Sequence, residues 1–355
     1  MSRGRAAVPG RALRLRGRTL TLALAAALLS PLVVGAAPAA VPEPIPVSGA
    51  AVAALTAPPA PCPPPPGSPT ADEVRDGLRT AKDRGFLWRV ERDGRTSWLY
   101  GTIHVARRDW MLPGPRTLDA LRRADALALE LDVTDPAVLG QLQQAVLAQA
   151  GDPPLAPALR ARLDRAVAAG CVGADELRPL RPEMQAMTLV VSAARRAGLE
   201  PAYGVDVVLA GLAHGLEKPV RSLEAPADQI AVLVHADPAE AAQNVADLLD
   251  EIERPGSAAQ LERLANAWQG SRLDELESWP QWCDCLGTER ERAAVARLID
   301  DRNVAMAARI ERDHGRSGAL FAAVGSLHMV GPQGLPALLR ARGFRVTRVE
   351  FDPAD

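Results

Sequence analysis

The chain has 355 residues, with 41 Lys and Arg against 43 Asp and Glu and a formal net charge of -2 at pH 7. Proteins that bind nucleic acid by electrostatic attraction normally present a basic face, so this balance argues against that class of function. Hydrophobic residues make up 48% of the chain but aromatic residues only 3%. We therefore expect one or two globular domains with a core built mainly from Ala, Leu and Val.

Residues 1–40 have the pattern of a secretory signal peptide. An arginine-rich segment precedes an apolar, uncharged run from Thr19 to Ala37, and small residues follow it. This is the order of a positive region, an apolar region and a cleavage site. The pattern predicts export and cleavage, which gives a periplasmic or secreted protein with no stable membrane span in its mature form. The run is also long enough for an uncleaved helix that anchors the protein to the inner membrane, and this alternative stays open.

Residues 41–70 are rich in Pro and Ala, a composition typical of an extended linker. We therefore place the folded domain in residues 71–355. It opens with a helix that ends at Gly85, a residue preferred at helix stops. Phe86–Val90 and Ser97–Tyr100 then flank a charged turn with a glycine, which predicts a β-hairpin.

The segment Ser97–Asp132 contains an apolar strand, a loop, a helix and a second strand. Gly101 closes the first strand and stands three residues before His104. The second strand ends in Glu130 and Asp132. Because side chains alternate along a strand, these two acids should share the face opposite to the leucines around them.

The segment Ala319–Asp352 repeats this order near the C-terminus. Gly325 stands three residues before His328, a Gly/Pro loop and a helix follow, and the last strand carries Glu350. Alternation of strands and helices is typical of α/β folds. We predict an α/β fold whose central mixed sheet is built from two similar strand–GxxH–helix–strand units.

Between the two units, from about residue 135 to 316, the pattern predicts a large, mainly helical insertion. One short strand interrupts it and ends in Glu224, and Asp206 opens the short helix before that strand. The predicted longer helices are Pro136–Ala150, Pro157–Gly170, Pro182–Gly198, Ala227–Asp250, Ser257–Gly270 and Thr288–His314.

His104 and His328 both lie just past the C-terminal end of a strand, which is where ligands bind in open α/β sheets. Glycine at 101 and at 325 would permit a tight chain reversal that aims each histidine over the sheet. If the two units lie side by side, the histidines converge and Glu130 can join them. Two imidazoles and a carboxylate make a workable catalytic metal site.

A divalent metal there would lower the pKa of a bound water and polarise a carbonyl group. Glu130 is either a ligand or the general base, and the sequence leaves both open. Further candidates for ligands or supporting partners are Asp132, Asp206, Glu224 and Glu350.

A single G-x-x-H is a weak signal, because most such histidines cap or pack. Two in matched settings, in a chain with five histidines, strengthen it. H-E-x-x-H does not occur, so the chain lacks the zincin signature.

The chain has four cysteines, Cys62, Cys171, Cys283 and Cys285. An even count in an exported protein favours structural disulfides, and four cysteines allow three pairings. Cys283 and Cys285 are too close in sequence for the usual C-x-x-C metal knuckle. A bond between these two would be strained, so we expect each to pair with Cys62 or Cys171.

Short motifs occur in one order over roughly residues 86 to 352: Leu99-Tyr100-Gly101-Thr102-Ile103-His104, Leu129-Glu130-Leu131-Asp132, Tyr203-Gly204-Val205-Asp206, Lys218-Pro219-Val220, Leu223-Glu224, Gln229, Arg302-Asn303 and Gly325-Ser326-Leu327-His328. In this order they resemble the TraB/GumN family, which is related to the Tiki and pheromone-shutdown proteins. The resemblance implies an α/β core shared with erythromycin-esterase-like and ChaN-like proteins.

The resemblance also implies a metal-dependent hydrolase site with His104, Glu130 and His328 at its centre. Arg302 and Asn303 would support the site or its substrate together with Asp206 and Glu224, although they could equally be a packing pair on a long helix. Tiki relatives look like manganese- or cobalt-dependent peptidases, so the resemblance favours these metals over zinc.

The sequence and the resemblance together predict an exported metalloprotease-like hydrolase that acts on a peptide or protein in the cell envelope. One alternative is a periplasmic protein that binds or sequesters peptides without turnover. A second is a heme- or metal-handling protein, suggested by the ChaN-like relatives.

Overall fold

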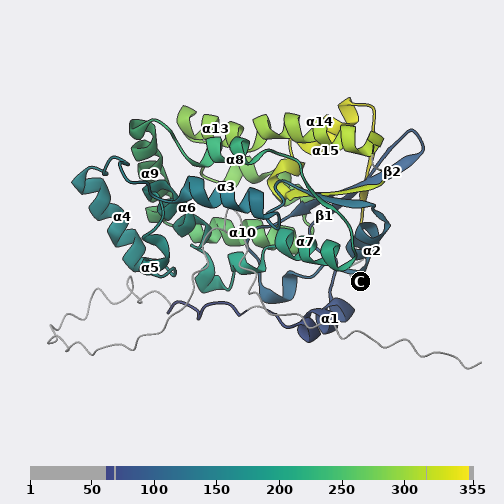
Figure 1. The fold of residues 1–355 in the computed structure, drawn as a ribbon, viewed down its shortest axis with the longest axis horizontal. Coiled ribbons are helices and arrows are strands. Elements are labelled where there is room, and N and C mark those ends of the chain that lie inside the picture. The colour runs from purple at the N-terminus through teal and green to yellow at the C-terminus, as the bar shows by residue number, and fades with distance from the viewer. Residues whose placement is uncertain (1–60, 68, 317, 352–355) are drawn as a thin grey trace, which may run out of the picture.

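The computed structural model describes residues 61–67, 69–316 and 318–351 (Figure 1). The predicted signal peptide and most of the predicted linker lie outside these residues. Within the described part of the chain, no helix is both long enough and apolar enough to cross a membrane.

The predicted α/β fold is confirmed. The described residues form a six-stranded mixed sheet in the order β4-β3-β5-β2-β1-β6. Its strands are β1 (Phe86–Arg92), β2 (Arg95–Thr102), β3 (Ala126–Leu129), β4 (Val220–Ser222), β5 (Leu320–Gly325) and β6 (Arg345–Val349).

The parallel pairing of β2 with β5 is what brings the two G-x-x-H motifs together. Trp98 lies opposite Phe321 at one end of the pair, and Thr102 lies opposite Gly325 at the other. Parallel strands end at the same edge of a sheet. The loops that carry His104 and His328 therefore leave the sheet side by side, which is the condition under which we expected the two histidines to converge.

The closing strands of the two segments take different places in the sheet. β3 pairs with β5 in parallel, whereas β6 pairs antiparallel with β1 at the opposite edge. Glu350 follows β6, where its side chain is 72% exposed and pairs with Arg348. The expected strand Val349–Asp352 thus occurs earlier, at Arg345–Val349, and its acid does not reach the site.

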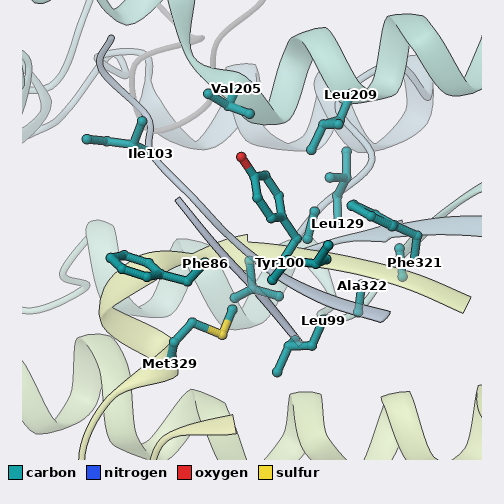
Figure 2. Close-up of a cluster of buried hydrophobic side chains, with 14 of the residues drawn as sticks. Phe86, Leu99, Tyr100, Ile103, Leu129, Val205, Leu209, Phe321, Ala322 and Met329 are labelled. Carbon is teal, nitrogen blue, oxygen red and sulfur yellow. The ribbon is translucent and has the colours of Figure 1, made fainter. Parts of the chain in front are cut away.

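The main hydrophobic core surrounds the sheet on both faces. In Figure 2, Tyr100 points towards Val205 and Leu209, while its neighbour Leu99 points to the opposite face, where Met329 lies. The first face is covered by α7 (Val205–Gly215), and the second by α14 (Asp301–Arg316) and α15 (Leu335–Ala341). β3 and β5 are buried along their whole length, as expected for parallel strands with helices on both faces.

Between β3 and β5 the described elements are helices apart from the edge strand β4, which pairs with β3 in parallel. The helices gathered furthest from the sheet in Figure 1 form a second core with Leu163, Met184 and Leu249 at its centre. The remaining helices are α1 (Ala71–Thr80), α2 (Pro115–Arg123), α3 (Pro136–Val146), α4 (Pro157–Ala169), α5 (Ala174–Leu177), α6 (Pro182–Val191), α8 (Pro226–Leu233), α9 (Pro238–Glu253), α10 (Ser257–Gln269), α11 (Leu273–Glu277), α12 (Trp279–Trp282) and α13 (Glu289–Val295).

Three of the long predicted helices are interrupted. In the segment Pro182–Gly198, α6 ends at Val191 and a separate 3₁₀ turn, Arg195–Ala197, follows. The segment Ala227–Asp250 divides into α8 and α9, because the Asp237 side chain caps a new helix by accepting from the Ala239 N–H, with Pro238 in the first turn. The segment Thr288–His314 divides into α13, a π-helical stretch Ala296–Asp300 and α14.

The expected cysteine pairing is wrong. The structure has disulfides Cys62–Cys171 and Cys283–Cys285. The short loop closes because Asp284 adopts the left-handed conformation (φ 50°), which turns the chain back and leaves the two Cα atoms 5.1 Å apart. Cys62–Cys171 attaches the extended segment 61–67 to the chain just beyond α4.

The long-range disulfide should contribute most of the disulfide stabilisation. Its cysteines are 109 residues apart, and the chain-entropy account gives a bond of this span about 2–5 kcal/mol of free energy of unfolding. We expect the double substitution Cys62→Ser with Cys171→Ser to lower that free energy by this amount in urea denaturation. The matched control, Cys283→Ser with Cys285→Ser, removes a disulfide that closes a far shorter loop. It should therefore lower the free energy of unfolding by less. An equal or larger loss for the short loop would contradict the expectation.

Candidate active site

The two G-x-x-H loops are joined at the sheet edge. His104 follows the end of β2, and His328 lies in the short 3₁₀ helix η5 (Ser326–Met329) that follows β5. The Ser326 hydroxyl donates a hydrogen bond of 2.7 Å to the Thr102 carbonyl, so the start of one loop is tied to the start of the other.

His104 is held from the first turn of α7. Its Nδ1 lies 2.8 Å from Oδ2 of Asp206, and the Thr102 hydroxyl donates to the other oxygen of the same carboxylate at 2.5 Å. The backbone adds a second tie, because the Val205 N–H donates to the Ile103 carbonyl. With Nδ1–H bound to Asp206, Nε2 is the atom that His104 presents to the rest of the site.

His328 is held from α14. Asn303 donates through Nδ2 to the Gln333 carbonyl at 2.9 Å, so its amide oxygen faces Nδ1 of His328 at 2.7 Å. An amide oxygen only accepts, and Nδ1 must therefore carry the hydrogen. Burial lowers the pKa of His328 to about 4, which leaves the ring neutral at pH 7 with its lone pair on Nε2.

Glu130 follows the end of β3 and is buried. Its Oε1 accepts the Gly325 N–H at 2.9 Å and lies 3.9 Å from Nε2 of His104. Burial alone would raise its pKa, but several groups outweigh burial and hold that pKa well below its ordinary value: His328, which is protonated only at the low pH where Glu130 titrates, the cations Arg302 and His104, and the Gly325 N–H. Glu130 is an ionised group with fixed partners.

Arg302 holds two buried carboxylates together. Its Nε and Nη2 donate to the two oxygens of Glu224 at 2.8 and 2.5 Å, and Nη2 also reaches Oε2 of Glu130 at 2.5 Å. The Gln229 amide donates to both carboxylates at 3.3 Å. Arg302 thus contacts Glu130 and Glu224, and its neighbour Asn303 contacts His328.

The π-helical stretch Ala296–Asp300 comes directly before these two residues. π-Helical turns inside α-helices are rare and are frequent at functional sites. Arg302 and Asn303 lie in the first turn of α14, directly after this stretch, and contact Glu130 and His328 in the loops after β3 and β5.

Gly325 and Gly101 are not needed for a left-handed backbone conformation, because neither has a positive φ. Their role is to leave space for neighbouring groups. A Cβ atom on Gly325 would lie 3.3 Å from Oε1 of Glu130, 3.4 Å from Nε2 of His104 and 3.6 Å from Cδ2 of His328. A Cβ on Gly101 would lie 2.9 Å from the Ser326 hydroxyl. The chain reversal expected at both positions is thus replaced by close approach, and the bare face of Gly325 is the floor of a small space between three polar groups.

Asp132 does not join this group. Its Oδ1 accepts hydrogen bonds from the backbone and the hydroxyl of Thr134, which is a local turn. The expected alternation fails because β3 ends at Leu129, so Glu130 and Asp132 stand in a loop. Leu131 is buried as expected, but Glu130 is buried as well.

Thr102, Ser326 and Gln229 had no role assigned from the sequence. A signal for the first two was present, because a hydroxyl residue follows the glycine in both G-x-x-H motifs. Trp268 of α10 was also missed, and its Nε1 donates to the Gly101 carbonyl at 2.8 Å.

Among the described residues, no group of three or more His, Cys, Asp or Glu is already arranged to hold a metal ion. The donor chemistry nevertheless fits a divalent cation, with two imidazoles oriented through Nδ1 and one ionised carboxylate around the space above Gly325.

Comparison with protein families agrees with the motifs. The TraB/PrgY/gumN family matches residues 86–348, which include all six strands up to Arg348. The chain belongs to this family.

Among similar curated proteins, two match over most of the domain and one matches over a short part of it. The uncharacterized protein YbaP of Shigella flexneri is 29% identical over 260 residues, 69% of this chain and 88% of that protein. YbaP of Escherichia coli (strain K12) is 29% identical over 256 residues, 68% and 87%. The metalloprotease TIKI1 of Danio rerio is 37% identical over 67 residues, 19% of this chain and 13% of TIKI1. No solved structure matches.

Removal of Arg302 should be costly, because it leaves Glu130 and Glu224 buried without their cation. We expect Arg302→Met to lower the free energy of unfolding by about 3–5 kcal/mol at pH 7.5. Arg75→Met, which breaks an exposed pair with Asp72 at 2.6 Å, should change it by about 0.5 kcal/mol or less.

The loss should shrink as pH falls. In the wild type the pKa of Glu130 is lowered, so its contribution is present above its unfolded pKa and is lost at lower pH. Without Arg302, burial raises that pKa, and protonation relieves the penalty on acidification. Urea denaturation at pH 7.5 and pH 5 measures both effects. A loss that is the same at the two pH values would refute this account.

Proposed function

We propose that this protein is a metal-dependent hydrolase in which His104, His328 and Glu130 hold one divalent cation. The observation that carries the proposal is the matched orientation of the histidines. An oxygen of Asp206 or Asn303 binds each Nδ1, and the opposite edges of both rings border the space above Gly325. This is how proteins usually orient imidazoles that bind metals.

The charge of the site supports a cation. Glu130, Glu224 and Asp206, counted as ionised, face a single guanidinium, that of Arg302. This leaves two negative charges in excess. Without a cation, a proton on His104, whose pKa the carboxylates of Asp206 and Glu130 raise to about 9, compensates one of them. One divalent cation bound to two neutral histidines would neutralise both. Buried charge without compensation is expensive, so the balance favours an occupied site.

A bound cation would supply Lewis acidity and lower the pKa of its water. The chain itself would position the groups: His104 and His328 bind through Nε2, and Glu130 binds through Oε1. Glu130 suits a ligand better than a general base, because its pKa is well below the working range and Oε2 is occupied by Arg302. The His104 side chain is 42% exposed, so a substrate would approach from its side.

A peptide or protein of the cell envelope is the substrate class that we propose. The partial likeness to a protein named metalloprotease supports peptide hydrolysis. A donor set of imidazoles and a carboxylate, without thiolate, is compatible with manganese or cobalt as well as zinc. The resemblance to Tiki relatives favours the first two.

The deciding experiment compares the full chain with His104→Ala and His328→Ala. We expect about one manganese or cobalt ion per wild-type chain by elemental analysis and cleavage of a peptide mixture by mass spectrometry. Both should be lost in each variant while circular dichroism stays unchanged. Wild type that takes up none of manganese, cobalt or zinc would refute the site. Metal uptake without cleavage would refute the hydrolase and favour the metal-handling alternative, whereas peptide binding that survives the loss of both histidines would favour the peptide-binding alternative.

Gly325→Ala tests the space itself. The added methyl group would stand between the three ligands, at 3.3–3.6 Å from each, and should lower metal affinity at least tenfold with little loss of stability. Gly211→Ala in α7 is the matched control, because a Cβ there meets nothing within 4 Å. It should leave affinity unchanged and stabilise the helix by up to about 1 kcal/mol. Isothermal titration with manganese measures the affinity, and equal affinities in the two variants would contradict the geometry.

A further inference from the structure

An apolar pocket is lined in part by Leu327, the residue that precedes the proposed metal ligand His328 in sequence. It has a volume of about 150 Å³, and its walls include Ile252, Leu261, Leu264, Trp279, Trp282 and Leu327. Leu327 is the residue before His328 in η5, and consecutive Cα atoms are about 3.8 Å apart. One wall of the pocket is thus part of the G-x-x-H motif itself.

We propose that this pocket binds a hydrophobic side chain, of leucine or phenylalanine size, from the peptide substrate. The inference rests on the proposed function and adds to it the substrate preference. The volume of the pocket, about 150 Å³, is the same as that of an apolar cavity that accepts a benzene ring. An aromatic or branched aliphatic side chain would fill the pocket, whereas glycine would leave it empty.

The chemistry of the walls excludes a charged side chain. Glu251 lies at the pocket, but Arg254 pairs with its carboxylate at 2.7 Å. The other polar members, Ser257 and Gln260, are uncharged. A lysine or aspartate side chain would lose its hydration there without gaining an ionic partner.

Two tryptophans contribute to the wall, and one of them, Trp279, also packs against the main hydrophobic core. Trp279 and Trp282 are both partly exposed and both line the pocket. Trp282 is nevertheless fixed, because its Nε1 donates to the Glu275 carbonyl at 3.2 Å and Arg263 stacks on its ring. A rigid, partly exposed aromatic wall is typical of binding sites for apolar groups.

The disulfide Cys283–Cys285 completes the wall, and both cysteines line the pocket. The Cys283 N–H donates to the Trp279 carbonyl, which ties the disulfide loop to the start of α12. This covalent loop keeps the wall in place before a ligand arrives, so less ordering is needed on binding.

The first arm of the test measures binding to the full chain, with N-acetyl-phenylalaninamide and N-acetyl-glycinamide as probes. The six tryptophans give six indole N–H signals in a ¹H–¹⁵N spectrum, and Trp279→Phe and Trp282→Phe assign two of them. We expect the phenylalanine probe to shift these two signals and to bind at least tenfold more tightly than the glycine probe. Equal binding of both probes, or shifts elsewhere only, would overturn the proposal.

Two variants on α10 make this arm specific. Ser257→Phe fills the pocket and should weaken the phenylalanine probe at least tenfold. Ala259→Phe adds the same ring at an exposed position of the same helix that does not line the pocket, and should leave binding unchanged. Unaltered binding in Ser257→Phe would also overturn the proposal.

The second arm separates this proposal from the proposed function. If peptides are cleaved, kcat/KM should be at least tenfold higher for a peptide with phenylalanine or leucine near the scissile bond than for its glycine analogue. Ser257→Phe should remove that preference, and an unchanged preference overturns the proposal. If no peptide is cleaved but the probe binds as expected, the hydrolase fails and the hydrophobic pocket stands.

Discussion

The buried guanidinium of Arg302 is the group on which the site depends. It joins three elements that are far apart in sequence: the end of β3 through Glu130, the end of β4 through Glu224, and α14, which carries Arg302 itself. A buried ionic cluster of this kind is weak evidence for stability, since its desolvation offsets much of the attraction. Its value lies in position, because two carboxylates cannot come so close without it.

The sheet supplies the rest of the geometry. β2 and β5 are parallel neighbours, and β3 lies on the other side of β5. The loops after all three strands therefore meet at one edge, with Gly325 in the middle. The N-terminus of α7 and the N-terminal half of α14 approach this edge from opposite faces, and each holds one histidine by Nδ1. His104 and His328 are thus oriented by the two layers of helices that cover the sheet.

The features that could be predicted from the sequence are those that depend on a short, continuous segment of the chain. Strand ends, the G-x-x-H motifs, an acid after β3 and after β4, and an acid at the start of a short helix are local patterns, and they led to His104, His328, Glu130, Glu224 and Asp206. Pairing across long distances is not local. The strand order, the disulfide pairs and the π-helical stretch before Arg302 depend on packing between segments, so Glu350 was expected at a site that it does not reach. Gly325 was noticed for the right position but the wrong reason, because the space that its missing side chain leaves is visible only when Glu130 and both histidines surround it.

The two histidines differ in a way that bears on how a cation would enter. His328 is buried, and burial lowers its pKa to about 4, so its ring is ready to bind. His104 is more open; burial opposes its charged form, but the carboxylates of Asp206 and Glu130 outweigh that and raise its pKa to about 9. In the absence of a cation, the proton on His104 supplies part of the positive charge that the carboxylates require. A cation that binds through Nε2 must displace that proton and takes over its charge, so metal binding and proton release are coupled at this residue. The same carboxylates that would attract a metal ion therefore also hold the proton that would compete with it, and the exposed histidine is where the exchange would take place.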